Sequence, residues 1–168
     1  MQSVMTRTAT LRAPSGSMTD VFACARAQIY YNSKRKSLAQ VKRETGCSHI
    51  INGYLFNGSF QPVGWTVIDG KVISRDAYQD WGISIGSDGK PQMLTDRGGS
   101  FLSGVPLLKN GAKLERSLTP DVARSAARTA VGWMPDGRIC LWCDKTSLTR
   151  EQLQNKLLGL GVADALML

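Results

Sequence analysis

Four of the Asp-Gly and Asn-Gly dipeptides constrain the fold of this chain more than any other feature of its sequence. They separate short runs rich in β-branched and apolar residues, and they are Asp69-Gly70, Asp88-Gly89, Asn110-Gly111 and Asp136-Gly137. Such dipeptides favour the two-residue turns of β-hairpins, in which turn residues adopt a positive φ. No fixed repeat period connects the turns, which disfavours a solenoid or a propeller. The sequence therefore predicts a core of several antiparallel hairpins.

Two segments carry the signals of helices. Each begins with a capping box, a Ser or Thr with a Gln three residues later, and each is followed by glycine, which favours the left-handed end of a helix. The boundary residues are Ser37, Gln40 and Gly46 in the first segment and Thr149, Gln152, Gly159 and Gly161 in the second. Combined with the hairpins, these two main helices predict an α+β fold with a β-rich core.

Three further runs read as strands. Residues from Val21 to Tyr31 alternate in character and predict one long strand, His49–Ile51 forms a short apolar strand, and Ala163–Leu168 has strand character. We expect residues 1–20, rich in Thr, Ser, Arg, Gly and Pro, to form a loose N-terminal leader. Residues 21–168 should then form one domain, because a chain of 168 residues has room for little more.

Composition and charge exclude some classes of protein and leave others open. Hydrophobic residues make up 42% of the chain and charged residues 20%, which excludes a wholly disordered or coiled-coil protein. No apolar run reaches the ~18 residues that a membrane-spanning helix needs. The formal net charge of +8 attracts phosphate-bearing partners in general. The basic residues are scattered apart from the run Lys34-Arg35-Lys36, so a solvated surface also explains them.

Metal binding and common catalytic motifs find little support in the sequence. Cys140 and Cys143 have the spacing of a zinc knuckle, but Ile139 to Cys143 reads as a strand, which points the two thiols to opposite faces. We therefore expect buried thiols, no metal and no cofactor. His49 is the only histidine; we expect it to pack beside Asn52, and a role as general base stays open. No Ser-His-Asp order and no phosphate-binding glycine loop is visible.

Two segments are candidate sites, and each has a simpler explanation. Asn52-Gly53 directly follows a buried strand, where an amide side chain and an accessible backbone can meet a ligand, although Asn-Gly is also a common turn. Arg128-Thr129 precedes a strand that includes Gly132, and a guanidinium there can bind a phosphodiester bidentately. An ordinary surface arginine is the alternative.

Taken together and in order, these segments resemble the phosphodiester glycosidase family. Asn52-Gly53-Tyr54-Leu55-Phe56 is similar to the family's N-G-G-F-F segment, with Tyr54 in place of the second glycine. The other matching blocks are Pro62–Ile73, with its Asp-Gly hairpin, Gly104–Gly111, Arg128–Gly137 with its R-T-A-x-G start, and Leu148–Leu168. The resemblance covers about residues 21–168. Each block is weak alone, but five in the family's order are hard to obtain by chance.

The resemblance implies an enzyme that hydrolyses a sugar-1-phosphodiester, releases the sugar and leaves a phosphomonoester. It implies catalytic roles for Asn52, Arg128 and Thr129, and contacts with substrate for Gly53, His49 and Gly132. Expected partners are a glycan phosphodiester or a phosphorylated sugar. The family is often secreted or associated with the cell envelope, and the sequence itself names no compartment.

One departure from the family pattern bears on activity. The family continues after its last strand with Asp-Gly-Gly-Gly-Ser, whose carboxylate lies in the active site, whereas this sequence stops at Leu168. We therefore expect a domain that is C-terminally truncated relative to the family and that turns over slowly or not at all. Two alternatives stay open. One is a catalytically inactive module of the same fold that binds carbohydrate or phosphate. The other is a basic nucleic-acid-binding domain, disfavoured because no basic, aromatic-rich strand pair is visible.

Overall fold

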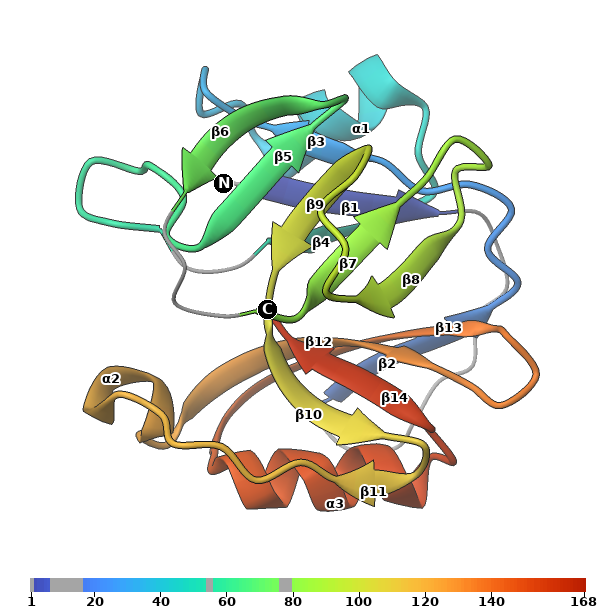
Figure 1. The fold of residues 1–168 in the computed structure, drawn as a ribbon, viewed down its shortest axis with the longest axis vertical. Helices are drawn as coiled ribbons and strands as arrows, with labels where there is room; N and C mark the ends of the chain where they lie inside the picture. The colour runs from blue at the N-terminus through green and yellow to red at the C-terminus, as the bar shows by residue number, and fades with distance from the viewer. Residues whose placement is uncertain (1, 7–16, 54–55, 76–79) are drawn as a thin grey trace. The chain divides into compact units, whose positions relative to one another are not determined.

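Antiparallel strands in three sheets account for much of the computed structural model of this chain (Figure 1). The structure describes residues 2–6, 17–53, 56–75 and 80–168, with the backbone alone described at 2–6, 17 and 121. Two compact units share the chain. The first comprises Met1–Thr8, Cys24–Val105 and Leu168, and the second comprises Ala9–Ala23 and Pro106–Met167. Residues 21–168, expected to form one domain, thus contribute to both units.

The first unit contains two sheets and one helix. Its five-stranded sheet has the order β6-β5-β9-β7-β8, and its three-stranded sheet has the order β3-β1-β4. Helix α1 (Leu38–Thr45) contacts β4. The strands are β1 (Gln2–Thr6), β3 (Ile29–Tyr31), β4 (His49–Asn52), β5 (Trp65–Ile68), β6 (Lys71–Arg75), β7 (Gly82–Ile85), β8 (Pro91–Leu94) and β9 (Ser100–Ser103).

The second unit is a six-stranded sheet with two helical segments. The strand order is β11-β10-β14-β12-β13-β2, and α3 contacts β13. Gln154 of α3 also donates a hydrogen bond to the carbonyl of Leu107 in β10. The elements are β2 (Ser17–Phe22), β10 (Val105–Lys109), β11 (Ala112–Lys113), α2 (Pro120–Ala123), β12 (Ala126–Trp133), β13 (Ile139–Leu148), α3 (Arg150–Gly159) and β14 (Asp164–Met167).

All four predicted turns connect neighbouring strands, so the prediction of hairpins is confirmed. Asp69 and Gly70 have φ of 49° and 77°, and Asn110 and Gly111 have 51° and 75°. Two successive positive φ values define the type I′ turn, whose twist matches that of the strands it joins. The α+β class with a β-rich core is confirmed as well.

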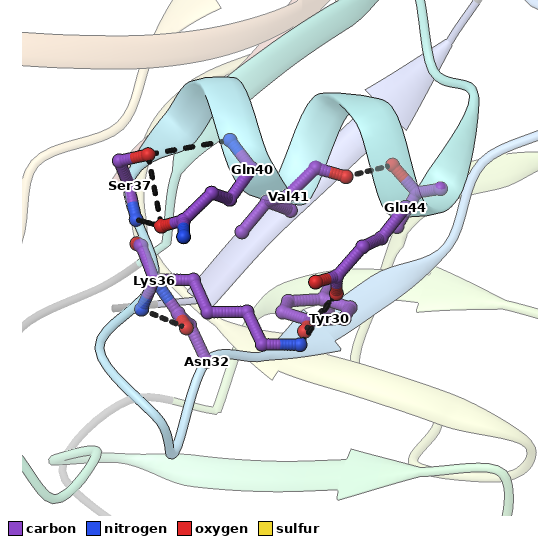
Figure 2. Close-up of polar contacts among 8 residues, drawn as sticks. Tyr30, Asn32, Lys36, Ser37, Gln40, Val41 and Glu44 are labelled. Carbon is purple, nitrogen blue, oxygen red and sulfur yellow. Dashed lines mark hydrogen bonds and ion pairs between the residues drawn. The ribbon is translucent and has the colours of Figure 1, made fainter.

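Both predicted capping boxes are present, which explains where the two main helices begin. Ser37 Oγ accepts from the backbone N of Gln40 at 3.3 Å, and the Gln40 side chain accepts from the backbone N of Ser37 at 2.8 Å (Figure 2). Thr149 and Gln152 make the same pair of bonds at the start of α3. Gly46 ends α1 with φ of 66°. Among the described residues, no helix is long and apolar enough to cross a membrane.

The prediction of one long strand from Val21 to Tyr31 is wrong. β2 ends at Phe22, residues 23–28 belong to no strand, and β3 begins at Ile29. The segment between the strands is held by other means, because the backbone N of Ala27 donates to the carbonyl of Gly89 at 2.7 Å. Parts of residues 1–20, expected to be a loose leader, are strands: β1 lies in the three-stranded sheet and β2 pairs with β13. The boundary at residue 20 stays a prediction.

The predicted C-terminal strand is β14, and its position explains its apolar sequence. It lies between β10 and β12 inside the six-stranded sheet. Ala165, Leu166 and Met167 are all buried. A strand with neighbours on both sides and burial on both faces needs a continuous apolar run rather than an alternating one.

Candidate functional site

Arg128 lies in β12, where its side chain is anchored by the end of a helical turn. Its Nη2 donates to the carbonyl of Val122 at 2.8 Å and to the carbonyl of Arg124, both in or just after α2. Carbonyls at the end of a helical turn lack partners within the helix, and a cationic side chain is a favourable donor to them. These hydrogen bonds therefore hold the half-buried guanidinium in one position.

Asp144 is the residue that the sequence analysis missed. It lies directly across from Arg128 in the β12–β13 register, so the two side chains share one face of the sheet. Only 5% of Asp144 is exposed. The backbone N of Thr146 donates to Asp144 Oδ1 at 2.9 Å, and the Thr146 hydroxyl donates to the same oxygen at 2.7 Å. These two bonds favour the charged form and hold the pKa of Asp144 below its usual range.

The length of the hairpin loop decides which residue of β13 lies across from Arg128. The Asp136-Gly137 turn fixes the register of β12 and β13, starting with the pair Trp133 and Ile139. Counting back from that pair places Arg128 opposite Asp144. The two-residue turn predicted from the Asp-Gly dipeptide would instead have paired Pro135 with Arg138 and set Arg128 across from Lys145. The loop has three residues, 135–137, because Met134 N donates to the carbonyl of Arg138. The register shift in this hairpin lies beyond Arg128, towards Ala126.

Thr129 and Gly132 are also in β12, but they do not share the surroundings of Arg128. Thr129 follows Arg128 directly, so its side chain points to the opposite face of the sheet, across from Cys143. Gly132 has a packing explanation of its own: an added Cβ would lie 2.5 Å from Cγ1 of Val162 and 3.4 Å from the carbonyl oxygen of Asp164. Roles for both residues in substrate binding or catalysis stay predictions.

His49 and Asn52 are the first and last residues of β4 in the first unit, and Gly53 follows the strand directly. His49 opens the strand, with Nδ1 3.1 Å from the hydroxyl of Ser48, and Asn52 closes it, with Nδ2 donating to the carbonyl of Gly53 at 3.2 Å. Because the two side chains are three residues apart in one strand, they point to opposite faces, which argues against the expected packing of His49 beside Asn52. Asn52 is exposed, Gly53 is buried, and Tyr54 and Leu55 lie outside the described residues.

The predicted site residues therefore fall into two groups. His49, Asn52 and Gly53 belong to the first unit, and Arg128, Thr129 and Gly132 belong to the second.

Two thiols are protonated at neutral pH. Burial raises the pKa of Cys140 to about 11, assisted by the negative charge of Asp20, and burial raises the pKa of Cys24 to about 11. Protonated thiols are poor nucleophiles and poor metal ligands. Cys140 and Cys143 are three residues apart in β13, on opposite faces. In the described part of the chain, no three His, Cys, Asp or Glu side chains are grouped so as to hold a metal ion.

Comparison with known proteins agrees with these motifs. A model of the phosphodiester glycosidase family matches residues 45–168, a span that includes all of the predicted site residues. Among solved structures, the chain is similar to the catalytic domain of zebrafish N-acetylglucosamine-1-phosphodiester alpha-N-acetylglucosaminidase auto-inhibited by its pro-peptide. The TM-score is 0.57 and the identity 19%, over 99% of this chain and 75% of the zebrafish chain. No curated protein sequence matches significantly. Because the family model matches well over half of its length, this chain belongs to the phosphodiester glycosidase family.

Proposed function

We propose that this protein hydrolyses a sugar-1-phosphodiester, releasing the sugar and leaving a phosphomonoester on the remainder of the substrate. The observation that carries the proposal is the family match over residues 45–168. The similar zebrafish protein is, by its name, an enzyme for an N-acetylglucosamine-1-phosphodiester, and we infer the same class of substrate for this chain.

At the phosphate, the reaction mainly needs positive charge and hydrogen-bond donors that hold the substrate in position. Water adds to the anomeric carbon, the bond from that carbon to the phosphate oxygen breaks, and the bonding electrons leave with the phosphomonoester. Arg128 places its positive charge beside the phosphate and donates to a non-bridging oxygen, because a guanidinium has donors on more than one nitrogen while its Nη2 is anchored. Anchoring to the carbonyls of Val122 and Arg124 supports this role, since a preorganised donor needs no rearrangement when charge develops.

Asp144 adds a carboxylate on the same face as Arg128. Its lowered pKa keeps it ionised at neutral pH, so it can orient the guanidinium or accept a proton from the attacking water, but it cannot donate one. Asn52 and the backbone of Gly53 orient the sugar in this proposal, and Thr129 supplies a hydroxyl.

The test is a sugar-release assay with an N-acetylglucosamine-1-phosphodiester. Arg128→Ala should lower kcat/KM by roughly 10²-fold or more, as loss of a donor to developing charge typically does. Arg128→Lys should recover little of the loss, because a compact ammonium cannot both keep the bonds to the carbonyls of Val122 and Arg124 and donate to the phosphate. Arg138→Ala is the matched control, since Arg138 directly precedes β13 in the same hairpin and its exposed side chain pairs with Asp136. Equal loss in Arg128→Ala and Arg138→Ala would overturn the assignment of Arg128.

A second candidate is a module that binds the same ligands without cleaving them. Asp144 favours it, because this carboxylate, which shares a face of the sheet with Arg128, is ionised at neutral pH and cannot itself serve as a general acid. Calorimetric titration with the same phosphodiester separates the two candidates. Binding that depends on Arg128 without release of sugar supports the module, and release of sugar excludes it.

A further inference from the structure

Two phenylalanine rings and one arginine form an exposed cluster in the first unit. Phe56 and Phe60 stack with ring centroids 5.5 Å apart and an interplanar angle of 10°. Arg35 places its guanidinium carbon 4.2 Å from the centroid of Phe60. The rings are open to solvent, with 49% of Phe56 and 44% of Phe60 exposed, so apolar surface lies next to a cation. We call Arg35, Phe56 and Phe60 the aromatic patch.

The loop that carries Phe60 extends away from β5 and β6 (Figure 1) and is fixed by one side chain. Oδ1 of Asn57 accepts from the backbone N of Ser59 at 2.9 Å and of Gln61 at 3.0 Å. Phe60 has φ of 63°, a conformation that bulky residues rarely adopt, and yet its ring is exposed. Packing in a core therefore does not explain why the loop holds this residue in a strained conformation.

The turn that carries Arg35 is built in the same way (Figure 2). Asn32 is buried and clamps the backbone of Lys36, donating to its carbonyl at 2.7 Å and accepting from its N at 2.8 Å. Arg35 itself has φ of 52°. No hydrogen bond or ion pair of its guanidinium occurs among the described residues, so its N–H donors are available to a partner. Two strained residues thus meet in one exposed patch, as they do at binding sites.

The chain around the patch carries an excess of positive charge. Residues 32–61 contain five Lys and Arg against one acidic residue, Glu44, which is paired with Lys36. The exposed basic residues are Lys34, Arg35, Lys42 and Arg43. The region therefore combines exposed aromatic rings with positive charge that its own carboxylate does not balance.

We propose that the aromatic patch docks this protein on the surface of a bilayer that contains anionic lipids. Phe56 and Phe60 enter the boundary between headgroups and acyl chains, where apolar side chains are favourably removed from water. Arg35 and its exposed neighbour Lys34 stay at the level of the headgroups and bind their negative charge. The inference does not rest on the proposed function, because docking needs no turnover.

The shape of the patch favours a bilayer over a peptide or a nucleic acid. Peptides bind in grooves or along the edges of sheets, whereas this loop extends outward. Bases stack on open ring faces, whereas the ring of Phe60 already carries Phe56 and Arg35. A bilayer suits apolar groups that project between cations, because its apolar interior lies directly beneath its charged headgroups.

The test is co-sedimentation with lipid vesicles, which requires no substrate. The probes are vesicles of phosphatidylcholine alone and of a roughly three-to-one mixture of phosphatidylcholine and phosphatidylserine. At low salt the mixed vesicles should bind the protein at least about tenfold more tightly, since each cation near the surface contributes roughly fivefold. Binding should weaken as salt is raised, because salt screens exposed charges.

Three variants examine the patch itself, and thermal unfolding confirms that each is folded. Arg35→Gln should weaken binding to the mixed vesicles by roughly fivefold, and Phe56→Ala by roughly three- to tenfold. Phe56→Trp reports insertion directly. Relative to the unchanged protein, its fluorescence should shift to shorter wavelength when mixed vesicles are added, because the indole leaves water. Phe60 is kept in all of them, since its strained position makes it the riskier one to replace.

Two control variants lie at the other edge of the five-stranded sheet, where β8 is the last strand. Lys90→Gln removes an exposed cation and Leu94→Ala an exposed apolar side chain, and both should bind as the unchanged protein does. No binding to the mixed vesicles, or equal weakening by Arg35→Gln and Lys90→Gln with none by Phe56→Ala, would overturn the inference. So would tighter binding of poly-glutamate than of the vesicles, because the occupant would then be an acidic protein segment.

Discussion

The β12–β13 hairpin and the chain from Asn52 to Gln61 place functional groups in opposite ways. In the hairpin, the three-residue loop 135–137 sets the register, and the register sets Arg128 across from Asp144. In the other segment, a short strand leads into a loop in which Asn57 bonds hold Phe60 at positive φ. In a regular ladder, the loop at its end determines which residues face each other over many positions. In an irregular loop, the backbone conformation of each residue depends on its own side-chain contacts. Substitutions that change side-chain packing should therefore destabilise the hairpin most, and substitutions that remove a single hydrogen bond should destabilise the loop most.

The largest effect is expected at the close packing of β12. Gly132→Ala brings a Cβ to within 2.5 Å of Val162, so we expect the free energy of unfolding to fall by about 1–3 kcal/mol, as overpacking usually costs. Urea titration measures the change. Adding Val162→Ala should recover part of the loss, and the two changes should then be non-additive.

Gly159→Ala is the matched control for that prediction. Nothing lies within 4 Å of a Cβ at Gly159, which is the last residue of α3, so this substitution should leave stability unchanged or raise it by up to about 1 kcal/mol. A similar loss in both variants would show that the close contact at Val162 is not what requires glycine in β12.

The next effect concerns the loop. Asn57→Ala removes two acceptor bonds to backbone N–H groups and should lower the free energy of unfolding by about 1 kcal/mol. Asn57→Asp keeps the acceptor oxygens and should cost less. The comparison between the two regions would fail if Asn57→Ala and Asn57→Asp were equally stable.

The smallest effect is expected from the titration of Asp144. Hydrogen bonds from Thr146 lower the folded-state pKa, so the carboxylate stabilises the protein above its ordinary unfolded pKa of about 3.9, and this contribution is lost as pH falls through the folded-state value. Thr146→Val removes the hydroxyl bond and should raise the pKa of Asp144. Thermal unfolding measured between neutral pH and about pH 2 should give the variant a lower melting temperature than the unchanged protein at neutral pH. This difference in melting temperature should shrink below about pH 4. A difference in midpoint that stays constant with pH would contradict this account.

The same contrast explains what the sequence could predict. Asp-Gly turns and capping boxes are local signals, and the hairpins and both main helices followed from them. The run from Val21 to Tyr31 alternates like a strand, yet it breaks after Phe22 because the segment bonds to the turn at Gly89 instead of continuing a ladder. Counting from a two-residue Asp136-Gly137 turn would have set Lys145 across from Arg128; Asp144 takes that place because the loop has three residues. No local sequence pattern predicts the positive φ of Phe60 or the position of Arg35 over its ring, because both depend on contacts distant in sequence.

Within the site, the central claim is that Arg128 and Asp144 act together in cleaving a sugar-1-phosphodiester, and a double-mutant cycle tests it most directly. kcat/KM for sugar release is measured for the unchanged protein, Arg128→Ala, Asp144→Asn and the double variant, with thermal unfolding confirming that each is folded. If the two residues form one unit, the double variant should be about as slow as the slower single variant, because removing one partner already abolishes the function of the other. Losses that multiply in the double variant, or an unchanged rate in Asp144→Asn, would contradict the account.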